Sequence, residues 1–107
     1  MMSNHNGTQD AQAANTFAGA GTIVQTITLP GGAVGTPKTI KGTGSVSGYV
    51  TITYGNGAQV LVPVNPNAPF AERPIPPTAF PSKVGSVSVT LGADGAGVIR
   101  AIVSFAP

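Results

Sequence analysis

The chain has 107 residues, enough for one domain with a modest core, and only 7% of them are charged, against roughly 25% in an average soluble domain. Five Lys or Arg and three Asp or Glu give a net charge of +2, which excludes a strongly cationic nucleic-acid-binding protein, because such binding needs clustered Lys and Arg. Val and Ile outnumber Leu by 19 to 3 and cysteine is absent, so a helical bundle, a coiled coil and a disulfide scaffold are excluded too.

The first 20 residues are small and polar, with Phe17 as the bulky apolar residue after Met2. They lack the periodic apolar face that a packed helix needs. We therefore predict an extended polar N-terminal arm over residues 1–20, either flexible or laid across a neighbouring subunit with Phe17 docked in its surface. The arm lacks the basic and apolar regions of a signal peptide, and no stretch approaches the roughly 18 apolar residues of a membrane helix. Neither export nor a membrane partner is expected.

Three later segments share a hairpin pattern: residues 25–34, 50–60 and 87–98. In each, apolar residues alternate with Thr, Ser or Val, a glycine-rich turn follows, and Ala and Val resume. Alternation with period two that ends at such a turn is typical of a β-hairpin. The sequence therefore predicts three hairpins.

The register of the middle hairpin follows from its apolar residues. A three-residue loop over residues 55–57 pairs Ile52 with Val60, so that both strands keep their apolar side chains on one face. This loop requires Gly57 to be left-handed. It also points Leu61 outward and leaves the outer face partly apolar.

The third hairpin contains two apolar stripes, and two further apolar residues, Val98 and Ile102, lie on its opposite surface. We expect a second sheet or a second subunit to cover this surface. The stripes consist of Val87, Val89 and Leu91 in the first strand and Ile99, Ala101, Val103 and Phe105 in the second.

Seven prolines fall between residues 63 and 81, where they exclude a helix and a central strand. We predict an extended crossover loop over residues 63–81 that links the second hairpin to the third, as in a Greek key. Phe70, Ile75 and Phe80 are its large apolar residues, and we expect them to contact a neighbouring molecule.

Residues that carry chemistry are few. His5 is the single histidine, and Asp10 is its only acidic neighbour along the chain, which is too few for a metal site. Turn chemistry and a local ion pair account for Asp94 and Glu72 better than acid–base catalysis does. The glycines of residues 42–48 match neither a P-loop nor a dinucleotide fingerprint. We expect no catalytic, metal or cofactor site, and hence no enzyme.

The sequence thus predicts an all-β fold: a small β-sandwich or jelly-roll-like domain of about six to eight antiparallel strands over residues 21–107, preceded by the arm. A surface with so few charges associates readily with other protein, since like charge is what keeps monomers apart. We therefore expect a non-catalytic structural subunit of a larger assembly.

In its length, its lack of cysteine, its Ala, Thr and Gly content, its polar N-terminal arm and its compact β-domain, the chain resembles small phage capsid decoration (cement) proteins and accessory virion proteins. The resemblance implies a virion protein that is made in the host cytoplasm and forms trimers in contact with capsid or tail protein, with no cofactor and no nucleic acid. The alternative is a β-sandwich glycan- or surface-binding module of the adhesin type, against which the few aromatic residues count. The expected assembly contacts are Phe17, Leu61, Phe70, Ile75, Phe80 and Ile102.

Overall fold

The computed structural model describes residues 7–55, 57–68 and 71–107, and it contains eight β-strands in two sheets of four. The strands are β1 (Gln9–Phe17), β2 (Gly21–Thr28), β3 (Thr36–Gly44), β4 (Gly48–Thr53), β5 (Gln59–Val64), β6 (Ala71–Pro74), β7 (Ser86–Ala93) and β8 (Gly97–Ala106). The expectation of an all-β domain of this size is confirmed.

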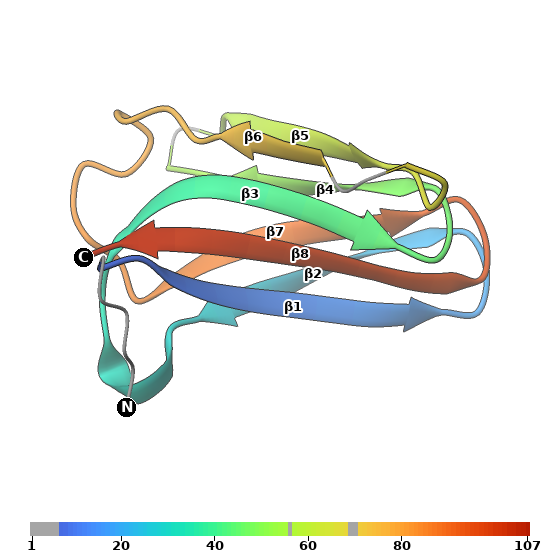
Figure 1. Ribbon diagram of the computed structural model, residues 1–107, viewed down its shortest axis with the longest axis horizontal. Coiled ribbons are helices and arrows are strands. Elements are labelled where there is room, and N and C mark those ends of the chain that lie inside the picture. Colours follow the sequence, from blue (N-terminus) through green and yellow to red (C-terminus); the bar gives the residue numbers. More distant parts are fainter. Residues whose placement is uncertain (1–6, 56, 69–70) are drawn as a thin grey trace.

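The two sheets have the strand order of a jelly roll. One sheet, which we name the β1 sheet after its edge strand, has the order β1-β8-β3-β6, and the other, the β2 sheet, has the order β2-β7-β4-β5. All neighbours in both sheets are antiparallel. The β1 sheet lies over the β2 sheet in Figure 1, with β1 and β2 on one side of the sandwich and β5 and β6 on the other. Eight antiparallel strands wound in this order define the jelly-roll architecture.

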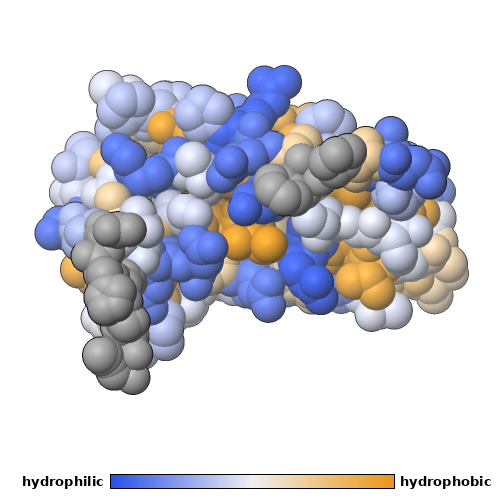
Figure 2. All heavy atoms as spheres, viewed as in Figure 1, coloured by the Kyte–Doolittle hydropathy of each residue, from blue (hydrophilic) through white to orange (hydrophobic). Residues whose placement is uncertain are grey.

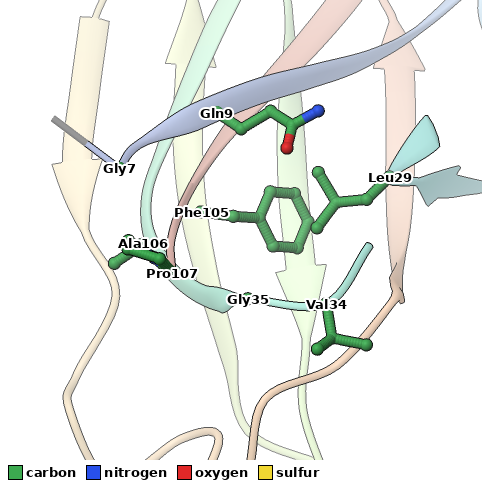
Figure 3. A pocket seen from close by; sticks show the side chains of 8 residues that line it. All are labelled: Gly7, Gln9, Leu29, Val34, Gly35, Phe105, Ala106 and Pro107. Carbon is green, nitrogen blue, oxygen red and sulfur yellow. The ribbon is translucent and has the colours of Figure 1, made fainter. Parts of the chain in front are cut away.

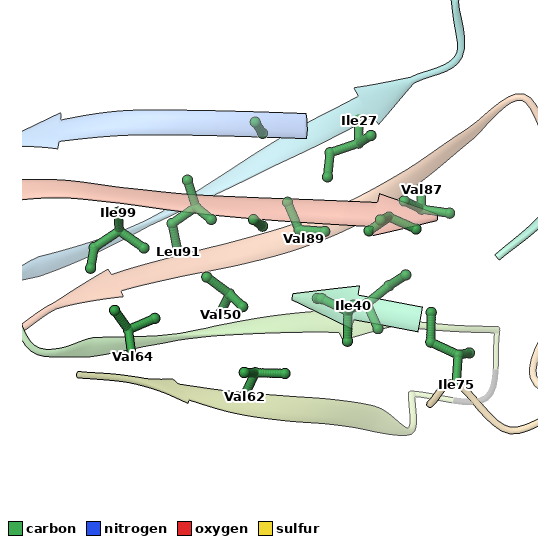
Figure 4. Packing of buried hydrophobic residues seen from close by; sticks show 14 of the residues in the cluster. Ile27, Ile40, Val50, Val62, Val64, Ile75, Val87, Val89, Leu91 and Ile99 are labelled. Carbon is green, nitrogen blue, oxygen red and sulfur yellow. The ribbon is translucent and has the colours of Figure 1, made fainter. Parts of the chain in front are cut away.

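The core lies between the sheets and is built by the alternation of side chains along each strand (Figure 4). Both apolar stripes predicted for residues 87–105 are buried in it. They belong to opposite sheets, however, because β7 joins the β2 sheet and β8 joins the β1 sheet. The predicted hairpin over residues 87–98 is therefore wrong. Two apolar stripes can be buried by packing against each other across a sandwich as well as by lying side by side in one sheet. The alternation of residues therefore indicates which face of a strand points inward, but not which strand it pairs with.

The predicted hairpin over residues 25–34 is wrong for the same reason. β2 ends at Thr28, a short 3-10 turn follows at Pro30–Gly32, and the chain then enters β3 in the other sheet. β2 pairs instead with β7, whose residues lie 58 to 72 positions further along the chain than their partners. The glycine-rich turn carries the chain from one sheet to the other.

The middle hairpin is confirmed in its register. Ile52 is paired with Val60, and the Tyr54 N–H donates to the Ala58 carbonyl oxygen at 3.0 Å, which closes the three-residue loop. Gly57 has φ of 86°, in the left-handed region. Leu61 points outward, as predicted, and is 49% exposed.

The N-terminal arm predicted for residues 1–20 is wrong over residues 9–17, which form β1. This strand pairs with β8 over its whole length, from Gln9 opposite Phe105 to Phe17 opposite Gly97. Phe17 is 8% exposed and packs in the core of its own chain rather than on a neighbour. β1 is an edge strand whose outward residues are polar except for Ala14, and only two of its inward residues are buried, so its apolar signal is weak. Residues 1–6 lie outside the described residues.

The proline-rich crossover contains a strand that the sequence analysis did not expect. Residues 71–74 form β6, which pairs with β3 at the edge of the β1 sheet. Pro63 lies in β5, the edge of the β2 sheet. Both positions fit the rule that proline, which has no N–H, is tolerated at sheet edges. The remaining loop, over residues 75–85, crosses back from the β1 sheet to β7.

Candidate interaction face

Among the described residues, the outward side of the β2 sheet carries no Asp, Glu, Lys, Arg or His side chain. Its middle row runs across all four strands as Val24, Thr90, Thr51 and Leu61. We name this surface the uncharged face. Its members are Thr22, Val24, Thr26 and Thr28 from β2, Ser86, Ser88, Thr90 and Gly92 from β7, Tyr49, Thr51 and Thr53 from β4, and Gln59, Leu61 and Pro63 from β5.

The outward side of the β1 sheet is different. It carries Asp10, Lys41, Glu72 and Arg100, which is half of all the Lys, Arg, Asp and Glu residues in the chain. Lys41 and Glu72 are directly opposite each other on β3 and β6, and the Ser104 hydroxyl donates to Asp10 Oδ1 at 2.6 Å. Figure 2 shows hydrophilic side chains spread over this side of the molecule. The two faces of one small domain therefore differ sharply in charge.

The uncharged face exposes apolar side chains among its hydroxyl groups. Val24 is 66% exposed and Leu61 is 49% exposed, at opposite ends of the middle row. The Tyr49 ring lies against Gly92, where a Cβ atom would collide with it. The glycine at this position thus lets the aromatic ring lie close to the sheet.

Thr51, at the centre of the face, is 3% exposed, and its Oγ1 has no hydrogen-bond partner among the described residues. Its neighbours in the row, Thr90 and Leu61, cover it. A buried hydroxyl without a partner destabilises the fold, because it loses its hydrogen bonds to water.

We predict that Thr51→Val raises the free energy of unfolding by about 1 kcal/mol, since valine has nearly the same shape and no hydroxyl group to desolvate. Urea denaturation monitored by circular dichroism measures this change. Thr53→Val is the matched control: Thr53 Oγ1 accepts a hydrogen bond from Gln59 Nε2 at 3.0 Å, so this change is expected to give no gain. A loss of stability in Thr51→Val would contradict the prediction.

The structure separates the residues that the sequence analysis expected at assembly contacts. Leu61 lies on the uncharged face, and Ile102 is half-buried on the other face, between Gln12 and Lys41 on the neighbouring strands. Phe80 is half-buried, with its ring centroid 5.8 Å from that of Tyr54.

Two of the expected contacts are corrected and one falls outside the structure. Phe17 and Ile75 are core residues, so neither is available to a partner. Ile75 is buried because β6 leads it inward, where its N–H donates to the Lys38 carbonyl oxygen at 2.8 Å. Phe70 lies outside the described residues.

Four surface pockets are large enough to consider as sites, and one of them, of about 380 Å³, lies on the outward side of the β1 sheet beside Arg100. Another, of about 240 Å³, opens at the end of the sandwich over Phe105 and Leu29, and Figure 3 shows that its lining side chains are apolar apart from Gln9. Two others, of about 460 and 470 Å³, adjoin at Tyr54 and Pro76 on the side of β5 and β6, and Arg73 lines the second. These pockets bring together no pair of acidic or basic side chains.

Within the described residues, no group of three or more His, Cys, Asp or Glu side chains lies close enough together to hold a metal ion. Within the same residues, no helix has the length and apolar character needed to cross a membrane. His5 lies outside the described part of the chain. No model of a known protein family matches the sequence, and no curated protein matches it.

The predicted hairpin register placed Leu61 outward together with Tyr49, Thr51 and Thr53, which lie in the part of the uncharged face on β4 and β5, but the part on β2 and β7 was not predicted. The signal of the whole face was present in the alternating Thr and Ser residues of three separate segments. These segments form one surface only when β2, β7 and β4 are placed side by side, and that order needs the strand pairings.

Proposed function

We propose that this chain is a non-catalytic structural subunit of a larger protein assembly, and that other protein covers its uncharged face. The observation that carries the proposal is the contrast between the faces: the described residues place four charged side chains on the outward side of the β1 sheet and none on that of the β2 sheet. Burying an unpaired charge in an interface costs far more than burying a hydroxyl group, whose hydrogen bonds a partner can supply, and burying a methyl group is favourable.

The size of the face supports contact with a partner. Four strands about 4.8 Å apart and about seven residues long, at roughly 3.3 Å per residue, give a plane of about 20 by 23 Å. This is roughly half of the 800 Å² that one partner contributes to a standard interface. The face is thus a substantial part of an interface, to which further contacts of the chain must add.

The particular assembly that we propose is a virion, in which the chain decorates or stabilises a capsid, or serves in the tail, without a cofactor. Capsid proteins are one of the groups in which the jelly roll recurs, which is an argument from analogy. The small size, the low charge and the uncharged face all suit a subunit held against a larger protein surface.

Mass spectrometry of particles purified from the organism that encodes the chain tests this proposal. The expected result is the chain in a fixed ratio to the main particle protein. Ser88→Glu places a charge on the uncharged face at an exposed position and is expected to lower incorporation at least tenfold. Gln12→Glu, on the other face, is the matched control and is expected to incorporate normally. Absence of the chain from all particles would contradict the proposal.

A second candidate function is a glycan-binding module. It is favoured by the pocket of about 470 Å³ in which Tyr54, Gln59 and Arg73 come together, because an aromatic ring, an amide and a guanidinium group are suitable partners for a sugar. A glycan array with the purified chain tests it. Saturable binding to one class of sugar, lost in Tyr54→Ala, would place this function ahead of the first.

A further inference from the structure

The four edge strands of the sandwich are unequally protected against pairing with another strand. β5 contains Pro63, and β6 is four residues long and includes Glu72, Arg73 and Pro74. Charges, prolines and short length are the usual means of blocking a sheet edge. β2 has none of these: its eight residues, Gly21–Thr28, include neither a charge nor a proline.

The remaining edge, β1, lies on the same side of the sandwich as β2 and is partly blocked. It carries Asp10, and the Gln25 side chain reaches across from β2 to donate a hydrogen bond from Nε2 to the Ala14 carbonyl oxygen at 3.3 Å. On β2 itself, Val24 is 66% exposed and Ile23 is 37% exposed. β2 is therefore the open edge among the described strands.

The backbone groups that β2 offers at this edge follow from its pairing with β7. The Leu29 N–H donates to the Gly85 carbonyl oxygen at 2.8 Å, and this pair continues the register of the two strands. In an antiparallel ladder, hydrogen-bonded and non-hydrogen-bonded pairs alternate. The odd-numbered residues of β2 thus bond to β7, and the even-numbered residues point their N–H and C=O groups to the open edge. These are Thr22, Val24, Thr26 and Thr28.

We infer that the open edge of β2 pairs, antiparallel, with β2 of a second copy of this chain, about a two-fold axis at Gln25. This register sets Val24 opposite Thr26 of the other copy and Thr22 opposite Thr28, in each direction. Four such pairs form about eight hydrogen bonds. Core-facing residues stay opposite core-facing residues, so that the partly exposed Ile23 meets Ile27 of the other copy.

The absence of charge on β2 favours a second copy of the chain as its partner. Pairing about a two-fold axis brings the middle of a strand next to its own copy, so any charge there would face the same charge. β2 has no charge to repel its copy. The pairing also joins the two β2 sheets into one and doubles the uncharged face to roughly 900 Å², the size of one side of a standard interface.

This inference deepens the proposed function by naming one neighbour in the assembly. A two-fold contact makes dimers, whereas the resemblance to decoration proteins implies trimers. The dimer is thus a distinct expectation with its own test.

A single cysteine tests the pairing, because the chain has none of its own. Across the proposed axis Gln25 faces its own copy in a non-hydrogen-bonded pair, with Cα atoms about 4.5 Å apart, which suits a disulfide. Gln25→Cys is expected to form a disulfide-linked dimer in nearly full yield under mild oxidation. Ile23→Cys is the matched control, because its two copies lie about 13 Å apart and cannot be linked. Equal linking of both variants, or of neither, would overturn the inference.

Thr26→Pro gives a second readout by sedimentation velocity. It removes an N–H that points to the open edge, so the ladder with β7 stays complete and circular dichroism is expected to show the native strand signal. The wild-type chain is expected to be a dimer and Thr26→Pro a monomer, while Thr26→Val, which keeps the N–H, is expected to stay a dimer. A wild-type monomer, or a dimer in Thr26→Pro, would overturn the edge pairing. Ser88→Glu changes a residue of β7 rather than of the edge strand and is expected to stay dimeric. The test of the β2 edge contact is therefore independent of the test of the uncharged face in particles.

Discussion

Deletion of residues 1–20 is expected to abolish the folding of the domain. The deletion removes β1 with its nine-residue ladder to β8, and it takes Ala13 and Phe17 out of the core. β8 would then present an open edge and part of its apolar inner surface to water. Circular dichroism of the truncated chain is expected to show no cooperative unfolding transition.

A point substitution separates the loss of the strand from the loss of chain length. Phe17→Ala is expected to lower the free energy of unfolding of the isolated chain by about 3 kcal/mol, the lower end of the range for a buried phenylalanine. A deletion that stops before Gly7 removes no described strand and is the control. If Phe17→Ala left the isolated chain as stable as before, the side chain would be a docking group for a neighbour and β1 would be an arm after all.

Phe105→Ala is expected to lower the free energy of unfolding by about 4 kcal/mol, a large part of the 5–15 kcal/mol that stabilises a typical domain. The Phe105 side chain is 1% exposed, and its ring lies beside Leu29 at the end of the sandwich (Figure 3). Its removal costs both the transfer of the ring from water and the cavity left behind.

The matched control for this substitution is Phe80→Ala. Phe80 is only half-buried and its ring contacts Tyr54 at the side of the sandwich, so we expect a loss of about 1 kcal/mol. Urea denaturation measures both variants. Equal losses would contradict the place of Phe105 in the core.

The fold class and the inward face of most strands were predictable from the sequence. The alternation of Val87, Val89 and Leu91, and the same pattern later in β8, identified buried stripes correctly. The three-residue loop of the middle hairpin was predictable because only one register keeps Ile52 and Val60 on one face. β4 and β5 are the one consecutive pair of described strands that lie side by side in a sheet, so local pattern sufficed there.

The other pairings were not predictable from local pattern. β1 and β8 come from opposite ends of the chain, and their pairing depends on how eight strands share two sheets. β1 was missed because Ala13 and Phe17 are its only buried residues and the other residues of the strand are polar or alanine. Ile75 was taken for a surface anchor because proline-rich segments are normally exposed, but the short strand β6 leads it into the core.

Predicting the uncharged face likewise requires knowing which strands pair with strands that are distant in the sequence. Leu61 was identified because the hairpin register alone turns it outward. The same hairpin register places Thr51 opposite Leu61, whereas Thr90 and Val24 complete the row only through the pairing of β4 with β7 and of β7 with β2. The composition indicated that charged residues are few, and the structure shows that the uncharged face is a part of the described surface that has none.

Hydroxyl-radical footprinting tests most directly whether other protein covers the uncharged face. The purified chain is compared with the chain within the particles or complexes that contain it, and oxidation is measured by mass spectrometry. We predict that Leu61 and Tyr49 are oxidised at least several-fold more slowly in the assembly, while Ile102 on the opposite face changes less. Equal oxidation of Leu61 and Tyr49 in both states would contradict the account.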